Sequence, residues 1–154
     1  MPTLQFQGEE IFAVPVDRVY AALTDLDALA RTLPDAVSTE RIDDRTLGAV
    51  VRPGFSFLRG TMKLRIALED LQPPASAQMR IEAQGIGVAM TVVSQMRLSA
   101  DGESTRAVWQ ADVVQMKGLV ATVSPGLVRA AADQVVRDGW KQLRARVEGV
   151  EETS

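Results

Sequence analysis

The chain has 154 residues, a net charge of -3 at pH 7 and a sequence pI near 5.0, so we expect no nucleic-acid partner, which would need a concentrated basic surface. It contains no cysteine and no histidine, which excludes disulfides, thiol nucleophiles, Cys- or His-ligated metal sites and histidine acid–base catalysis. Hydrophobic residues make up 46% and charged residues 24%, as in an ordinary globular domain. We expect one domain over residues 1–148 and a short acidic tail over 149–154.

The N-terminal residues are polar and strand-like, without the basic and then apolar layout of a signal peptide. No apolar run approaches the roughly 18 residues that a membrane-spanning helix needs. These features predict a cytoplasmic protein.

Alternation of apolar and polar residues predicts a first strand over 3–14, which Pro15 ends. Helical spacing follows over 16–23. Asp25 is placed to cap a second short helix that carries Leu26 and Leu29, and Pro34 stops it.

Between residues 37 and 116 the pattern has period two, interrupted by turn residues. The expected strands cover about 37–42, 46–52, 58–71, 77–84, 90–98 and 105–113. Each carries polar residues on one side, so the other side of an antiparallel sheet needs a cover.

The last third of the chain, residues 119–147, has the longest helical pattern. Ser124 and Pro125 match an N-cap followed by proline at the first helical position. The predicted apolar side comprises Leu127, Val128, Ala131, Ala132, Val135, Val136, Gly139 and Leu143. The predicted fold class is therefore α+β, a curved antiparallel sheet of about seven strands with two short helices and one long C-terminal helix packed over it.

Methionine and small residues dominate the inward positions of both sheet and helix. Methionine adapts to varied apolar partners, and small residues facing small residues leave space, so the pattern is compatible with an apolar cavity. Close packing of sheet and helix is the alternative, since interiors are normally dense. The residues that we expect to line the cavity are Met62, Leu64, Met79, Met90, Trp109, Val128, Ala131 and Val135.

Few polar residues point inward: Glu10, Thr39, Ser94 and Thr105. Glu10 and Thr105 are the candidate polar groups of the pocket. For Glu10 we favour a simpler role, pairing with a cation such as Arg41, because ionised carboxylates are seldom buried without partners. No catalytic motif, phosphate-binding loop or metal-ligand set stands out, so no catalytic residue, metal or cofactor is predicted.

The ordered motifs resemble the CoxG family, named for carbon monoxide dehydrogenase, of the START-like (SRPBCC) helix-grip superfamily. The resemblance rests on Phe6-x-Gly8, Val16-x-x-Val19-Tyr20-x-x-Leu23-x-Asp25, Leu33-Pro34, Gly85-x-Gly87 and Gly102-x-x-Thr105-x-x-x-Trp109-x-Ala111. The chain departs from the family at Asp35, where glycine is usual.

The resemblance implies a cavity between sheet and helix. It also implies a non-enzymatic carrier of a lipophilic, quinone- or lipid-like molecule, accessory to a molybdenum hydroxylase of carbon monoxide dehydrogenase type or docked at the inner membrane face. Two alternatives stay open: an enzyme resembling polyketide cyclases or dehydratases, and a ligand-free adaptor for enzyme maturation or membrane recruitment. We expect the pocket mouth beside residues 118–123, near the short helices around 26–34. The sequence does not indicate an oligomeric state.

Overall fold

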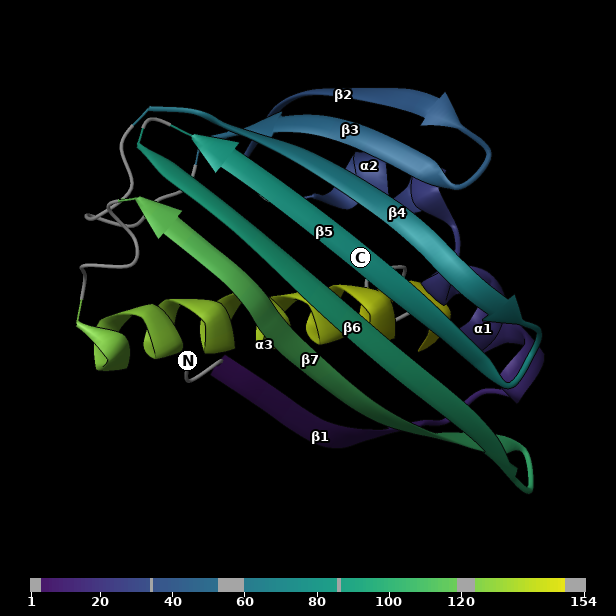
Figure 1. Ribbon diagram of the computed structural model, residues 1–154. Helices are drawn as coiled ribbons and strands as arrows, with labels where there is room; N and C mark the ends of the chain where they lie inside the picture. The colour runs from purple at the N-terminus through teal and green to yellow at the C-terminus, as the bar shows by residue number, and fades with distance from the viewer. Residues whose placement is uncertain (1–3, 34, 53–59, 86, 119–123, 149–154) are drawn as a thin grey trace.

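The computed structural model describes residues 4–33, 35–52, 60–85, 87–118 and 124–148 (Figure 1). The elements are β1 (Leu4–Phe12), α1 (Val16–Leu23), α2 (Leu26–Thr32), β2 (Ala36–Asp43), β3 (Thr46–Val51), β4 (Met62–Gln72), β5 (Ser76–Gly85), β6 (Val88–Asp101), β7 (Ser104–Gly118) and α3 (Pro125–Glu148). The predicted acidic tail at 149–154 lies outside the described residues.

Seven strands form one antiparallel sheet in the order β1-β7-β6-β5-β4-β3-β2. Consecutive strands from β2 to β7 pair as neighbours, and β1 joins the far edge by pairing with β7. The sheet curves around one side of α3 (Figure 1). The α+β helix-grip architecture predicted from the sequence is confirmed.

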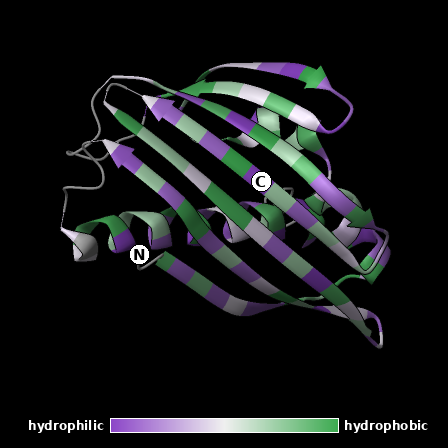
Figure 2. Cartoon of the chain, viewed as in Figure 1, coloured by the Kyte–Doolittle hydropathy of each residue, from purple (hydrophilic) through white to green (hydrophobic). Residues whose placement is uncertain are grey.

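Alternating hydropathy along the strands decides which face of the sheet meets α3 (Figure 2). On β4, Met62, Ile66 and Leu68 are buried on the inner face, while Lys63 and Arg65 are exposed on the outer one. This is the strand predicted over 58–71; it begins at Met62, and residues 53–59 lie outside the described ranges.

The two short helices sit at one end of the sheet. In α1, Val19 and Tyr20 are buried, and the Tyr20 hydroxyl donates to the Ser76 carbonyl over 2.9 Å. The Asp25 carboxylate accepts a hydrogen bond of 3.0 Å from the Ala28 amide, which confirms the predicted cap of α2. Asp35 has a φ of 60°, a left-handed conformation that favours glycine and explains why glycine suits this position.

The long helix begins at Pro125, as the Ser124-Pro125 pair predicts, and the predicted residues 119–123 lie outside the described part of the chain. Its buried side chains are Val128, Leu143 and Val147, with Trp140 half-buried. The predicted apolar side is wrong in its rotation, because Leu127 is 47% and Val135 57% exposed. The helix packs against α1 and β1, which turns its core-facing side toward Trp140 and Val147.

The apolar core gathers at the two ends of the grip. One buried cluster joins the α1 end of the sheet to the end of α3 and includes Phe12, Val19, Leu98, Leu143 and Val147. Another, at the opposite end, includes Val51, Met62, Ala83, Val88 and Val128. The helix is therefore anchored to the sheet at both ends.

Candidate ligand site between the sheet and α3

The helix α3 is held along the β1 edge by two arginine–phenylalanine contacts. The guanidinium of Arg129 lies 5.0 Å from the ring centroid of Phe6, and that of Arg144 lies 4.7 Å from the ring of Phe12. Fifteen helical residues rise about 22 Å and six strand residues about 20 Å, so helix and strand run side by side in the same direction. Each contact adds a cation–π attraction of about 0.5–1 kcal/mol where the groups are partly exposed.

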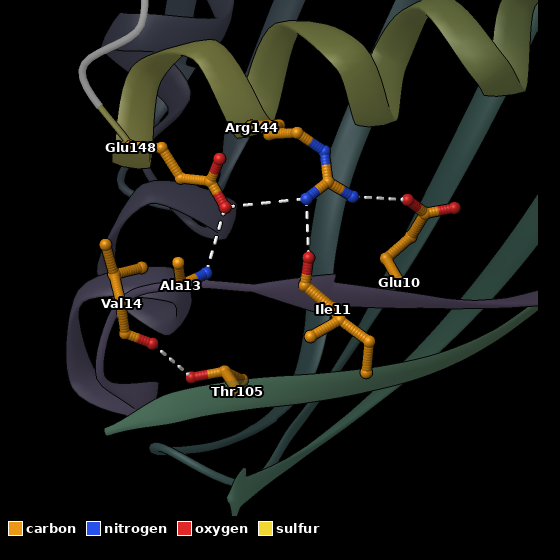
Figure 3. A network of polar contacts seen from close by, with 7 residues as sticks. All are labelled: Glu10, Ile11, Ala13, Val14, Thr105, Arg144 and Glu148. Atoms are coloured by element: carbon orange, nitrogen blue, oxygen red, sulfur yellow. Dashed lines mark hydrogen bonds and ion pairs between the residues drawn. The ribbon is translucent and has the colours of Figure 1, made fainter. Parts of the chain in front are cut away.

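A polar network strengthens this edge near the end of α3 (Figure 3). Arg144 Nη2 forms an ion pair of 2.7 Å with Glu10, and its Nη1 donates to the Ile11 carbonyl. The Glu148 carboxylate accepts a hydrogen bond of 2.9 Å from the Ala13 amide. Glu10 thus pairs with a cation, as favoured from the sequence, but the cation is Arg144; Arg41 pairs with Asp27 instead.

The hydroxyl of Thr105, the second candidate polar group, is used within the protein. Thr105 is 0% exposed and donates a 2.8 Å hydrogen bond to the Val14 carbonyl (Figure 3). The bond ties the start of β7 to the connection between β1 and α1. Thr105 therefore fixes the closed end of the grip.

The other flank of α3 is open in its middle. At about 100° per residue, Val128, Val135 and Arg146 project within about 20° of one another. Val128 is 5% exposed, and Arg146 donates to Thr32 Oγ1 over 3.0 Å and to the Ala22 carbonyl over 3.3 Å. Val135, between them, is 57% exposed, and a Cβ built on nearby Gly139 would meet no atom within 4 Å. This flank touches its neighbours at both ends and leaves a gap between.

The inner face of the sheet is also incompletely covered at its centre. The central strand β5 places Met79 opposite Ser94 and Ile81 opposite Val92 of β6. All four side chains are half-buried, whereas Ala77 and Met96, nearer the α1 end, are 4% exposed. The centre of a covered face is normally the most buried part of a sheet, so accessible space lies between these residues and the middle of α3.

The structure separates the predicted lining residues into three groups. Met62 and Val128 are buried in the end cluster, and Val135 is exposed at the open flank of α3. The half-buried group, on the inner side, comprises Leu64, Met79, Met90, Trp109 and Ala131.

Sequence reasoning did not place Ile81, Val92 and Ser94 in the lining, although all three share the inward alternation of their strands. Trp140 was also missed. Its ring centroid lies 5.8 Å from that of Trp109 and 6.1 Å from that of Phe12, so three aromatic rings form one wall at the α1 end of the site.

Two hollows open on the outside of the molecule, away from this face. One, of about 280 Å³, is lined by Arg18, Ala21, Ala22, Asp25, Arg146 and Val147. The other, of about 260 Å³, lies over the outer side of β2, β3 and β4 and includes Ile42, Gly48, Val50 and Lys63. Leu64 borders the second hollow, but most of its lining residues point away from α3.

The described ranges hold no cluster of three or more acidic residues placed to bind a metal ion. Of the helices in the described ranges, none is long and apolar enough to cross a bilayer. The chemistry of the inner face is therefore apolar, with few hydrogen-bonding groups.

A curved antiparallel sheet gripping one long helix over a partly open apolar face defines the START-like class of helix-grip proteins. The chain belongs to the CoxG family, named for carbon monoxide dehydrogenase, whose model matches residues 8–148. No curated protein matches the sequence closely enough to add a named relative.

Solved structures share the fold at low sequence identity. A conserved protein from Geobacillus kaustophilus is 18% identical, with a TM-score of 0.86 over 95% of this chain and 96% of its own. A START superfamily protein from Mycobacterium smegmatis is 16% identical, with a TM-score of 0.67 over 97% and 99%. The Zhui aromatase/cyclase from Streptomyces sp. R1128 is 18% identical, with a TM-score of 0.67 over 98% and 94%. At these identities the likeness supports the fold alone.

Proposed function

We propose that this protein is a non-enzymatic carrier that binds a lipophilic, quinone- or lipid-like molecule between the inner face of the sheet and α3. The observation that carries the proposal is the half-buried centre of that face, at Met79, Ile81 and Val92, beneath the open flank of α3 at Val135. An apolar surface left partly exposed inside a fold costs free energy, about 25 cal/mol per Å², which an apolar ligand would recover.

Small-molecule sites are typically concave and mostly apolar, with a few polar groups that fix orientation. The inner face fits this description. Met79 and Met90 can adapt to different ligand shapes, while Trp109 and Trp140 offer flat surfaces to a ring system. Entry would take place on the flank of α3 that faces α2, beside Leu29 and Leu33, both half-buried on α2 or just after it.

The family name supports a partner of carbon monoxide dehydrogenase type, a molybdenum hydroxylase, as the enzyme that the carrier serves. In this proposal the protein delivers its ligand to that enzyme or to the inner membrane face. Binding of the purified hydroxylase, measured by analytical size-exclusion chromatography with and without loaded ligand, tests the partner. A partner that binds only the empty carrier would favour the adaptor role.

Native mass spectrometry of the freshly purified protein tests the carrier role directly. We expect a species heavier than the chain by the mass of a small molecule, which is lost on denaturation. Titration of the emptied protein with menadione should quench the fluorescence of its two tryptophans saturably, because Trp109 lies on the inner face. Failure to take up menadione and long-chain fatty acids alike would contradict the proposal.

The alternative function, as an enzyme, is tested through Glu10, the carboxylate at the β1 edge. Its pairing with Arg144 gives it a structural use. We therefore expect Glu10→Gln to leave ligand binding unchanged. A substrate that is converted by the unchanged protein and not by Glu10→Gln would favour the cyclase-like alternative.

A further inference from the structure

The inner face of the sheet carries one accessible hydroxyl whose role the protein itself does not explain. Ser94 lies on β6, directly opposite Met79 of β5 and Ala111 of β7. Its nearest inward neighbours along the strand are Val92 and Met96. A hydroxyl at this position stands in an otherwise apolar part of the face.

The other polar residues expected on the inner side are accounted for. The Thr105 hydroxyl donates to Val14, and Glu10 is paired with Arg144. Thr39 is exposed on the edge strand β2. Ser94 is half-buried, and its side chain makes no hydrogen bond to any part of the chain that the structure describes.

Trp109 carries the remaining polar atom on this side, and its geometry differs. Its Nε1 is buried and has no hydrogen-bond partner within the described ranges. The indole lies over Gly8 of β1, on the side of β7 away from β6, where a Cβ on Gly8 would be 3.2 Å from Nε1. Trp109 Nε1 is thus enclosed, and Ser94 is the hydroxyl that a ligand in the open centre can reach.

The helix above contributes no competing polar group at this level. Its inward residues here are Ala132 and Val136, both half-buried. A ligand that fills the centre of the site therefore contacts apolar groups on almost all sides. Any oxygen that it carries loses water on entry, which costs free energy unless a hydrogen bond replaces it.

We propose that Ser94 is the specificity-determining residue of the site, and that its hydroxyl donates a hydrogen bond to a carbonyl or other acceptor oxygen of an otherwise apolar ligand. This inference rests on the proposed carrier function and narrows its ligand class. It selects oxygen-bearing lipophilic molecules over hydrocarbons of the same shape. A neutral hydrogen bond of this kind changes affinity by about two- to tenfold.

The test uses two substitutions of nearly equal shape, Ser94→Thr, which keeps the hydroxyl, and Ser94→Val, which removes it. The ligands are menadione and 2-methylnaphthalene, which share a ring skeleton and differ in the two carbonyl oxygens. Ser99→Ala, at an exposed position on the same strand, is the control for general effects on β6. Dissociation constants are measured by tryptophan fluorescence and checked by calorimetry.

We expect menadione to bind Ser94→Val about two- to tenfold more weakly than Ser94→Thr, with 2-methylnaphthalene binding both equally. Equal menadione affinities in the two variants, while the unchanged protein binds menadione, would overturn the role of Ser94 and leave the carrier function standing. If the unchanged protein binds neither ligand, the carrier function fails and the role of Ser94 fails with it.

Discussion

The indole of Trp109 lies against Gly8, its cross-strand partner on β1, so closely that a Cβ on Gly8 would sit 2.7 Å from Trp109 Cζ2. Side-chain atoms do not approach that closely, so this position has room only for glycine while the ring keeps its place. The contact sets the orientation of Trp109 and, through its packing with Trp140, the aromatic wall of the site.

Gly8→Ala should therefore destabilise the protein by about 1–3 kcal/mol, the usual cost of overpacking a well-filled site. Urea denaturation followed by circular dichroism measures the change. Gly139→Ala is the matched control, because its new methyl group meets no atom within 4 Å and a helical glycine-to-alanine change stabilises by up to about 1 kcal/mol. A Gly8→Ala protein as stable as the unchanged one would refute the tight contact.

Loss of Arg144 should loosen the β1 edge of α3. Arg144→Met removes the ion pair with Glu10 and the contact over Phe12. Since Arg144 is 34% and Glu10 28% exposed, we expect a loss of only about 1–2 kcal/mol in the free energy of unfolding. A double-mutant cycle with Glu10→Gln, measured by urea denaturation, isolates the pair.

Arg137→Met serves as the control for that experiment. Arg137 forms an exposed pair with Asp133 one helical turn away on the same helix. Pairs of this kind contribute about 0.3–0.5 kcal/mol. Equal effects of the two arginine substitutions would contradict a special role for Arg144.

Tyr20 should make stability depend on pH in the alkaline range. Burial raises the pKa of the Tyr20 hydroxyl above its usual value of 10.0, because the charged phenolate is disfavoured away from water. The folded state thus prefers the protonated form. This contribution is fully present below pH 10 and is lost as the pH rises through the higher pKa of the folded state.

Denaturation of the unchanged protein and of Tyr20→Phe at intervals from pH 8 to about pH 11.5 measures that dependence. The variant loses the hydrogen bond to Ser76, so it should be less stable near pH 8, by about 0.5–1.5 kcal/mol. The difference between the two proteins should shrink above pH 10. A constant difference across the range would argue against the raised pKa.

Filling the centre of the inner face should block ligand uptake. Val92 and Val93 are neighbours on β6, but Val92 pairs with Ile81 on the inner side and Val93 with Arg80 on the outer side. Val92→Phe should lower menadione affinity at least tenfold, whereas Val93→Phe should leave it within twofold, since each 1.4 kcal/mol lost is tenfold in affinity.

Val92→Ala keeps that experiment informative if the larger side chain disturbs folding. It enlarges the site and should retain menadione binding within about threefold. Fluorescence titration of all three variants, with circular dichroism as the check of folding, decides the matter. Equal binding by Val92→Phe and Val93→Phe would place the ligand elsewhere.

Local patterns were sufficient for most of the fold. Period-two alternation on β4 and β5, the cap at Asp25 and the start of α3 at Pro125 all follow from interactions within a few residues. The resemblance carried by short motifs identified the family that the match over residues 8–148 then showed.

Long-range pairings could not be read in the same way. Glu10 has Arg41 and Arg144 as candidate cations in the sequence, and only the path of α3 along β1 brings Arg144 within 2.7 Å. Thr105 looked like a group of the pocket because its alternation points inward, yet it meets Val14 at the closed end. Inward direction does not distinguish a packed end of the grip from its open centre.

The sequence by itself determined the order of the elements, the inner face of each strand and the apolar character of that face, because these depend on alternation and turn residues within each segment. Only the tertiary structure decided the rotation of α3, which leaves Val135 exposed, and the half-buried state of Met79, Ile81, Val92 and Ser94. Both depend on how a helix anchored at its two ends spans a curved sheet, a distance that no local pattern encodes.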